Sequence, residues 1–508
     1  MLLYRARSAR GRLRFERVRA VRHAVGRRDA RPRLRAGVHD HGRHVERDAK
    51  HSRRARAGAA ERTTGSGVSM TTHPVELSTR VIDSGVADEP VNRVDGSVWE
   101  LDTGLAFVES FSHSVVVNGG DSLACFDASG AGSGTQVVES IRKWSNSPVS
   151  HLVYTHGHAD HVGGSFAFAD DASSRGAPRP RVVGHSQVLA RMQRYEDTSE
   201  WNVLINRRQF GGIKSEMRAP MNASMGSFHD PSRFLPEGTL RPDETFDDRL
   251  DLRIGDVTAE LHHARGETDD HLWAWVPAKK WMFTGDFIIW NFPNAGNPQK
   301  VQRYALEWAQ ALRAMIAQEP ELLVPAHGLP IAGKARIASV LGDVASALES
   351  LVRQVLEMMN AGETLDTIVH TVKVPADVLA KPYLRPFYDE PEFVVRNIWR
   401  LYGGWWDGAA SRLKPAPDSV LGAEIASLAG GADVLIARAK GLAEDGDIRL
   451  ACHLADFAAW AAPDDPTIHA RRAEIYNRRR DTELSLMSKG IFKAAARESE
   501  AVVKRQQS

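Results

Sequence analysis

The sequence predicts an α/β fold followed by an all-α region, and three observations support this prediction. Residues 115–126 contain two apolar strands around an Asn-Gly-Gly-Asp turn, which is typical of a β-hairpin. Apolar residues then recur at helical spacing from Val137 to Trp144, ahead of another apolar strand at 151–154. Finally, one helical pattern follows another from about residue 345 to 500. The first part therefore contains a β-α-β unit.

The C-terminal third contains several predicted helices separated by short breaks. We expect helices at 345–359, 392–402, 433–442, 448–460 and 467–478. A shorter apolar stretch at 421–428 stops at Gly430-Gly431, which marks a turn. The last two predicted helices are joined by an Ala-Pro-Asp-Asp-Pro segment, and together they resemble one helical-hairpin repeat unit.

The segment with the clearest chemistry is 156–161, which reads His-Gly-His-Ala-Asp-His. Three imidazoles and one carboxylate within six residues form a dense set of ligands that a bound metal ion neutralises and orients. The segment follows the predicted strand at 151–154, and Gly163-Gly164 allow a sharp turn after it. The side chains are therefore expected at the mouth of a strand, where open metal sites are built. The alternative is a solvated loop that is merely rich in histidine.

The pattern His-x-His-x-Asp-His resembles the signature of the metallo-β-lactamase superfamily, over roughly residues 100–335. The resemblance implies an αββα sandwich with a dinuclear metal site. It assigns the first ion to His156, His158 and Glu267, the second ion to Asp160, His161 and His327, and the bridge to Asp286.

Asp127 follows the predicted strand at 123–126 and stands where the superfamily places an acidic residue. We expect Asp127 to support the metal loop, and a simple cap or turn role is the alternative. Two divalent ions about 3.5–4 Å apart can share a hydroxide and lower the pKa of bound water toward about 7. The catalytic residues would then be Asp160 and Asp286.

The ligand set contains nitrogen and oxygen donors without cysteine, which favours zinc, although manganese and iron have compatible softness. Diiron relatives usually carry Glu at the position of His158, so the resemblance implies two Zn²⁺ ions per subunit. Glu267 stands where most of the superfamily has His, 19 residues before Asp286. This exchange resembles the alkylsulfatase branch, where the later acid is usually Glu rather than the Asp found here.

The segment 397–408, which is rich in tryptophan and glycine, is similar to the dimerisation domain of alkylsulfatases. This similarity implies a homodimer through a helical domain, and a helix core followed by a turn is the alternative. The predicted domains are a catalytic domain at 70–335 and a helical dimerisation domain at 345–500.

Alkylsulfatases hold the sulfate with an Arg on the loop after the bridging acid, and here the matching position falls near Gln299 or Lys300. Lysine supplies a point charge but lacks the bidentate fork of arginine. The candidate substrate contacts are Asn294, Lys300, Arg303, Tyr304 and Arg208.

The segment 300–304 is expected to open a helix that ends near Ala314, so an exposed first turn is the alternative for Lys300 and Arg303. His263 and His271 lie near Glu267, and either could protonate a leaving group. Both are more simply read as strand histidines with satisfied partners.

The resemblance implies a metal-dependent hydrolase that cleaves alkyl sulfate esters with a metal-activated water. The departure at the sulfate-holding Arg keeps another ester class open, a phosphodiester or a lactone. An iron oxidoreductase on the same fold is a third possibility, since a fold does not determine a reaction.

The charge is unevenly distributed along the chain of 508 residues. Residues 1–69 contain 19 Arg, one Lys and six acids, so this segment carries +14 and the remainder −12. An acidic body does not suggest a nucleic-acid partner. The basic segment has no apolar periodicity, so we expect a disordered tail or upstream sequence with the true start at Met70. A polyanion-binding tail and an Arg-rich transit peptide are the rival readings.

Cys125 and Cys452 are the two cysteines of the chain, which excludes a disulfide framework. We find no apolar run of the length of a signal peptide or a membrane span. A cytoplasmic location is therefore expected, and the resemblance to alkylsulfatases implies a small-molecule ester substrate.

Overall fold

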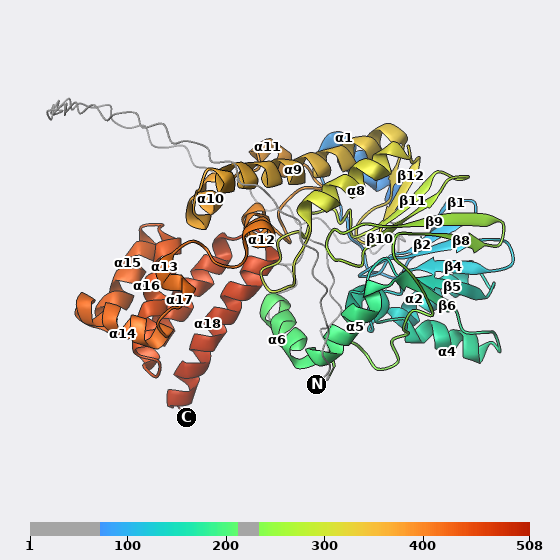
Figure 1. The fold of residues 1–508 in the computed structure, drawn as a ribbon. Coiled ribbons are helices and arrows are strands. Elements are labelled where there is room, and N and C mark those ends of the chain that lie inside the picture. The colour runs from blue at the N-terminus through green and yellow to red at the C-terminus, as the bar shows by residue number, and fades with distance from the viewer. Residues whose placement is uncertain (1–71, 212–232, 508) are drawn as a thin grey trace, which may run out of the picture. The chain divides into compact units, whose positions relative to one another are not determined.

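The computed structural model describes residues 72–211 and 233–507, and these described residues belong to one compact unit. The tail predicted at 1–69 lies outside the described residues. Within those residues two β-sheets lie face to face (Figure 1). The seven strands of the first sheet are paired in chain order: β1 (Val98–Asp102), β2 (Leu105–Val108), β3 (Ser114–Asn118), β4 (Leu123–Phe126), β5 (Val149–Val153), β6 (Arg181–His185) and β7 (Glu244–Phe246).

The second sheet contains six strands within the described part of the chain. In spatial order they are β13 (Ile331–Ala332), β12 (Leu322–Pro325), β11 (Trp281–Gly285), β10 (Leu272–Val276), β9 (Val257–His263) and β8 (Arg249–Ile254). Apolar side chains from both sheets fill the space between them, and the rings of Phe126 and Phe283 are 4.8 Å apart. This packing forms the centre of the sandwich.

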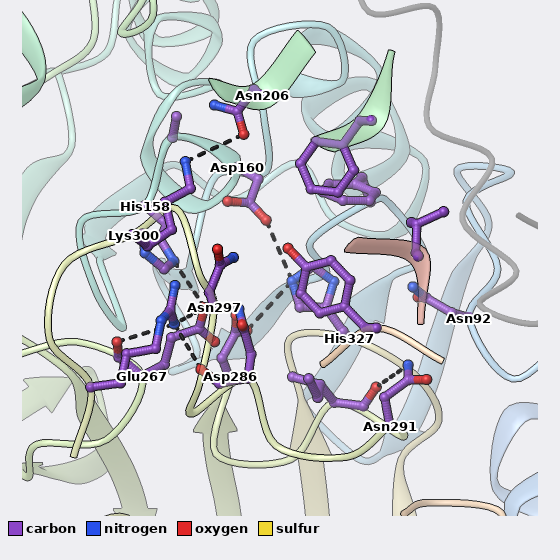
Figure 2. A pocket seen from close by; sticks show the side chains of 18 of the residues that line it. Asn92, His158, Asp160, Asn206, Glu267, Asp286, Asn291, Asn297, Lys300 and His327 are labelled. Carbon is purple, nitrogen blue, oxygen red and sulfur yellow. Dashed lines mark hydrogen bonds and ion pairs between the residues drawn. The ribbon is translucent and has the colours of Figure 1, made fainter. Parts of the chain in front are cut away.

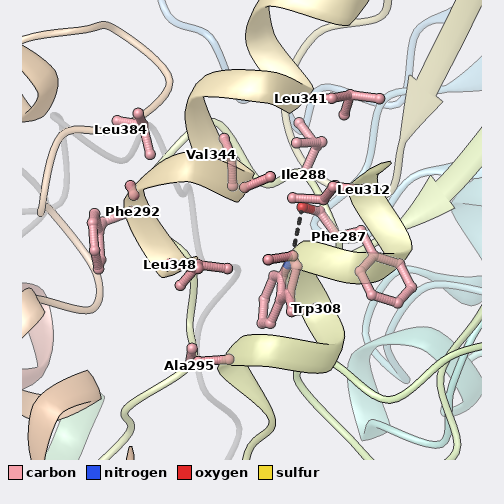
Figure 3. Close-up of a cluster of buried hydrophobic side chains, with 14 of the residues drawn as sticks. Phe287, Ile288, Phe292, Ala295, Trp308, Leu312, Leu341, Val344, Leu348 and Leu384 are labelled. Carbon is pink, nitrogen blue, oxygen red and sulfur yellow. Dashed lines mark hydrogen bonds between the residues drawn. The ribbon is translucent and has the colours of Figure 1, made fainter. Parts of the chain in front are cut away.

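Helices cover the outer face of each sheet. One apolar cluster packs the first sheet against α2 (Gly134–Trp144), α4 (Phe166–Ser174) and α5 (Gln187–Asp197). A larger cluster packs the second sheet against α1 (Pro74–Ser84), α8 (Ala305–Ala317) and α9 (Lys334–Asn360), with Trp308 fully buried (Figure 3). The predicted αββα sandwich is confirmed.

Parallel pairing brings the chemically active strand ends to one edge of each sheet. In the first sheet β4 and β5 run parallel, so Asp127 and His156 follow neighbouring strand ends. In the second sheet β11 and β12 run parallel, and they are followed by Asp286 and His327. Gly328 has φ +91°, and a Cβ there would lie 2.2 Å from Cδ1 of Trp290, so only glycine fits directly after His327.

The remaining helices are α3 and α6 of the first part and the helices of the C-terminal part. Their bounds are α3 (Ala159–Val162), α6 (Ser199–Phe210), α10 (Leu365–Thr371), α11 (Ala376–Leu379), α12 (Pro391–Gly403), α13 (Ala410–Leu413), α14 (Asp418–Ala429), α15 (Ala432–Glu444), α16 (Ile448–Ala461), α17 (Pro466–Thr482) and α18 (Leu486–Gln507). The all-α C-terminal region is thus confirmed, and its last helix lies beside α6 (Figure 1).

Two element boundaries differ from the sequence prediction. The helix expected to open at 300–304 begins at Ala305 as α8 and runs to Ala317, so Lys300 and Arg303 belong to the preceding loop. The helix expected from residue 345 begins at Lys334 and continues to Asn360 as α9. Its early turns are buried against the second sheet and α8, and this tertiary packing extends the helix beyond the pattern read from the sequence.

Cys125 lies in β4 and Cys452 in α16, and burial raises the pKa of each thiol to about 12. Among the described helices, none alone combines the length and apolar character of a membrane span. The bent pair α14 and α15, which meet at 85°, passes that test only when both are taken together.

Candidate metal centre

The predicted ligands come from four separate places in the fold and converge at the open edge of the sandwich. His156 and His158 follow β5, and the short helix α3 carries Asp160 and His161. Asp286 and His327 follow β11 and β12, while Glu267 lies on the loop between β9 and β10. Strand ends supply most of the set, which fixes the backbone from which the side chains project.

One group of ligand atoms gathers around Asp160, His161 and His327. The Nε2 atoms of His161 and His327 lie 3.6 and 3.5 Å from Oδ2 of Asp160. The same two nitrogens lie 3.4 and 3.5 Å from Oδ1 of Asp286. Four donor atoms therefore surround one point, and Figure 2 shows Asp160 and Asp286 on either side of His327.

A second group consists of His156, His158 and Asp286. Nε2 of His156 lies 3.8 Å from Oδ2 of Asp286, the carboxylate oxygen that faces away from the first group. Nδ1 of His158 lies 3.6 Å from Oε1 of Glu267. Asp286 thus presents one oxygen to each group, which is the arrangement that a bridging ligand requires.

The donor atoms fit divalent cations. A tetrahedral ion with metal–nitrogen distances of about 2.0–2.1 Å separates its ligand atoms by about 3.4 Å. Several donor pairs here stand at 3.4–3.6 Å, near that separation. Nε2 of His161, Oδ1 of Asp286 and Oε2 of Glu267 are also buried without a hydrogen-bond partner. Such unpaired polar atoms are costly, and a cation would supply their missing partner.

The electrostatics of the centre also favour a bound cation. Burial opposes protonation of His161, but Asp286, Asp127 and Asp160 outweigh it and raise the pKa of His161 well above its ordinary value. Burial also opposes ionisation of Asp286, but His161 and His327 lower its pKa strongly. The carboxylates therefore attract positive charge, which protons supply when no cation is present.

Asp127 holds the first group in place. Its carboxylate accepts hydrogen bonds from Thr155 N and Thr155 Oγ1, each at 2.7 Å, and from Nδ1 of His161 at 2.8 Å. Because Nδ1 carries the proton, Nε2 of His161 presents its lone pair to the metal position. Asp127 has φ 64°, a left-handed conformation that Asp tolerates better than bulky residues. These contacts support the role predicted for Asp127.

Glu267 is held by a different set of residues. Nη1 of Arg303 lies 2.6 Å from Oε1 of Glu267, and the amide of Asn294 donates to the same oxygen. Nη1 of Arg303 also donates to the carbonyl oxygens of Glu267 and Asn294, and the exposed fraction of the Arg303 side chain is 3%. Burial raises the pKa of Glu267 although Arg303 opposes this shift. Arg303 and Asn294 therefore anchor Glu267.

The centre opens into a cavity with a polar end and an apolar wall. Lys300 lines the polar end and donates from Nζ to Oδ1 of Asn206 at 3.3 Å (Figure 2). Burial lowers the pKa of Lys300 to about 8. The apolar wall contains Phe111, Phe210, Phe234, Ile289 and Leu486.

Three of the five predicted substrate contacts line this cavity: Asn294, Lys300 and Arg303. The other two have different surroundings. Tyr304 precedes α8, and its ring lies under the guanidinium of Arg265 at 4.7 Å. Arg208 donates to Oε1 of Gln299 at 3.2 Å and is not among the lining residues.

Several other lining residues were not predicted as site residues, among them Tyr195, Asn291, Asn297, Tyr388 and Leu486. Asn291 and Asn297 belong to the Pro-, Gly- and Asn-rich loop after Asp286, so loop composition was an available signal. Tyr388 and Leu486 are distant in sequence and reach the cavity through tertiary packing. Nε2 of His271 accepts from the backbone N–H of Asp286 at 3.1 Å, but Nδ1 is buried without a hydrogen-bond partner, so the expected satisfied histidine is found only in part.

This fold and paired centre define the class of protein. Residues 108–327 match the family described as "Metallo-beta-lactamase superfamily", and residues 364–501 match "Alkyl sulfatase dimerisation". The chain therefore contains a metallo-beta-lactamase domain followed by an alkyl sulfatase dimerisation domain. Both family resemblances predicted from the sequence are confirmed.

The chain is similar to several alkylsulfatases. A linear primary-alkylsulfatase of Pseudomonas sp. (strain ATCC 19151) is 26% identical over 353 residues, covering 68% of this chain and 65% of the relative. An (R)-specific secondary-alkylsulfatase of Pseudomonas sp. is 25% identical over 335 residues, covering 64% of this chain and 50% of the relative. This chain thus spans less than two thirds of the length of either relative.

The solved structure of the stereoselective inverting sec-alkylsulfatase Pisa1 from Pseudomonas sp. has the same fold. It superposes with a TM-score of 0.67 at 20% identity, covering 80% of this chain and 65% of that chain. A double mutant of the same protein gives a TM-score of 0.70.

Proposed function

We propose that this protein is a metal-dependent hydrolase of alkyl sulfate esters. The observation that carries the proposal is the cavity, which is lined by residues of both donor groups, by Lys300 and by an apolar wall. An alkyl sulfate has an anionic head and an apolar chain, so its two ends match the two ends of this cavity. The similarity to alkylsulfatases supports the same substrate class.

Different residues would bind the sulfate head and the alkyl chain of the substrate. Two divalent ions, when bound, lower the pKa of water and neutralise charge on anionic oxygens. Lys300 attracts the sulfate as a point charge, and Asn206 holds its ammonium group in position. The apolar wall excludes water and receives the alkyl chain.

For the ions themselves we propose two Zn²⁺ per subunit. Imidazole and carboxylate donors suit zinc, and the two groups contain two histidines each. His156 and His158 would hold one ion with Glu267, and Asp160, His161 and His327 the other, with Asp286 between them. Metal analysis of the protein as isolated, by plasma mass spectrometry, tests the identity and the number of the ions.

The direct test of function is sulfate release from sodium dodecyl sulfate by the zinc-loaded protein. We expect turnover in the parent protein and a large loss of turnover in Asp160→Ala. This variant removes a carboxylate that would bind the same ion as His161 and His327. Absence of turnover with both metals bound would overturn the proposal. Phosphodiester and lactone substrates would then be assayed with the same preparation.

We also propose a homodimer formed through the helical region. The matched dimerisation family supports this, as do exposed apolar side chains on the same region. Trp405, Val420 and Leu428 are 71%, 58% and 77% exposed, and a partner subunit would cover such surface. Light scattering after gel filtration should give twice the 56.0 kDa mass of the chain, and a monomer mass would contradict the dimer.

A further inference from the structure

Tyr388 is a residue of the cavity wall that the proposed function leaves unused. It lies in the segment between α11 and α12, beyond the strands and loops that supply the donor atoms, yet it lines the same cavity as Glu267, Asp286 and Lys300. Its ring stacks on Phe210 at the end of α6, with ring centroids 6.1 Å apart and an interplanar angle of 9°. The phenol therefore has a fixed plane at the edge of the centre.

The backbone around Tyr388 is fixed from two sides. Ser485 Oγ donates to the carbonyl oxygen of Tyr388 at 2.7 Å, and Leu486 N donates to the carbonyl oxygen of Phe387 at 2.7 Å. On the other side, Gly296 N donates to Oδ2 of the fully buried Asp389 at 2.6 Å. The segment is thus attached both to the start of α18 and to the loop that follows Asp286.

The hydroxyl of Tyr388 is oriented by a chain of side-chain amides. Nε2 of Gln209 donates to the hydroxyl oxygen of Tyr388 at 3.3 Å. Oε1 of Gln209 accepts from Nε2 of Gln299 at 3.4 Å, which determines which end of the Gln209 amide faces Tyr388. Gln209 is fully buried, and its backbone carbonyl oxygen would lie 1.7 Å from a Cβ added to Gly490 of α18. Close packing of α18 against α6 therefore fixes the position of Gln209.

A phenol that accepts a hydrogen bond from Gln209 still has one proton to donate. Among the described residues no acceptor is found for that proton. Burial raises the pKa of Tyr388 well above its ordinary value, and the charge of Glu267 raises it further, so the phenol stays protonated at neutral pH. The free O–H donor of Tyr388 therefore lies in a cavity whose proposed substrate carries sulfate oxygens.

We propose that Tyr388 contacts the substrate, donating its hydroxyl proton as a hydrogen bond to a sulfate oxygen of the ester. The proposal rests on the proposed function for the identity of that anion. Lys300 would attract the anionic head as a point charge, whereas Tyr388 would fix its rotation through a directional hydrogen bond. The helical region then contributes a substrate contact as well as a dimer surface.

The test compares Tyr388→Phe with the parent protein, using the full zinc-loaded chain. Phenylalanine keeps the stacking on Phe210 and removes only the hydroxyl. We expect kcat/KM for dodecyl sulfate to fall about ten- to a hundredfold, the loss typical of a hydrogen bond to a charged group. Affinity for inorganic sulfate, measured by calorimetry, should fall by a similar factor, while zinc content stays unchanged and Tm falls no further than in the control variant described next.

The matched control is Tyr383→Phe, because the hydroxyl of Tyr383 donates to Asp343 at 2.6 Å outside the cavity. This variant should lower Tm and leave kcat/KM and sulfate affinity unchanged. Gln209→Met, which removes the donor that orients the phenol, should show a smaller loss than Tyr388→Phe.

Parent-like turnover and sulfate affinity in Tyr388→Phe would overturn the inference. A parent protein that releases no sulfate from dodecyl sulfate would instead overturn the proposed function. In that case, weaker sulfate binding by Tyr388→Phe would still support the hydrogen bond, and unchanged binding would refute it.

Discussion

The two halves of the candidate centre are supported by different parts of the molecule. The sheet-held half, formed by Asp160, His161 and His327, is positioned through Asp127, which follows a strand of the first sheet. In the loop-held half, which comprises His156, His158 and the predicted ligand Glu267, Arg303 and Asn294 hold Glu267 in position.

The loop that carries Arg303 and Asn294 is itself held by the helical region. The amide of Asn397 on α12 donates to the carbonyl oxygens of Ala295 and Arg303, at 2.8 and 3.0 Å. The comparison teaches that the hold on His161 is internal to the sandwich, whereas the hold on Glu267 relies on a helix of the C-terminal domain. Variants should therefore affect the two halves separately.

The largest effect is expected at Asp286, because it belongs to both halves. Asp286→Asn should lower kcat/KM at least about a thousandfold, as the loss of several kcal/mol of charge stabilisation implies. Zinc content should fall for both ions. Asp121→Asn, in the exposed hairpin turn, is the matched control and should retain both. If Asp286→Asn kept one ion at parent affinity, the two halves would not share this ligand.

The next largest effect is expected at Arg303, which supports only the loop-held half. Arg303→Met leaves the buried Glu267 carboxylate without its cation, so the metal-free protein should lose about 3–5 kcal/mol of unfolding free energy. Added zinc should restore part of that loss, because an ion compensates the same charge. Chemical denaturation with and without zinc measures both values.

The control for that variant is Arg313→Met, since Arg313 pairs with Glu349 at the surface, where both side chains are 40% exposed or more. Such a pair contributes at most about 1 kcal/mol. Equal losses in the two variants would show that burial of the Glu267 pair has no special weight.

A smaller effect, confined to the sheet-held half, is expected at Asp127. Asp127→Asn keeps the left-handed backbone but weakens the hold on His161, so affinity for one zinc ion should fall about 10- to 100-fold. Chelator titration should therefore remove one ion earlier and leave the other at parent affinity. Equal weakening of both ions would show that the two halves are mechanically linked.

The smallest effect is a pH dependence at Lys300, which belongs to neither half. The pKa of Lys300 is lowered to about 8 by burial, so the ammonium is charged below pH 8 and loses its charge above it. KM for dodecyl sulfate should therefore rise severalfold between pH 7 and pH 9, as attraction for the anionic head weakens. Lys300→Met should have a raised KM that does not change over this range, and a parallel rise in both proteins would assign the effect elsewhere.

Several of the predicted donor residues follow strands that can be read locally. The apolar strand before His156 and the strands before Asp286 and His327 end in ligands, and parallel pairing brings such ends together. Asp127 was accessible by the same reasoning. The spacing of Glu267 required the family resemblance as well.

The cavity wall and the anchoring of Glu267 were not predictable from local patterns. Arg303 lines the cavity, and the sequence did not reveal that its guanidinium also pairs with Glu267, a partner 36 residues away. Tyr388 and Leu486 belong to segments without any chemical motif, and only the packing of α18 beside α6 brings them to the centre. Such contacts depend on how segments distant in sequence pack together, and the hydrophobic periodicity of the sequence does not predict that packing.

Both matched domains contribute residues to the cavity wall, and this has a consequence for exchanging domains between relatives. Tyr388 and Leu486 lie within the matched dimerisation domain, 364–501, whereas Asp286 and His327 lie within the preceding one. Gene chimeras that exchange whole dimerisation domains between relatives would therefore exchange part of the substrate-facing surface. In such recombinants, substrate preference should be inherited partly with the C-terminal parent and not solely with the metal-bearing parent.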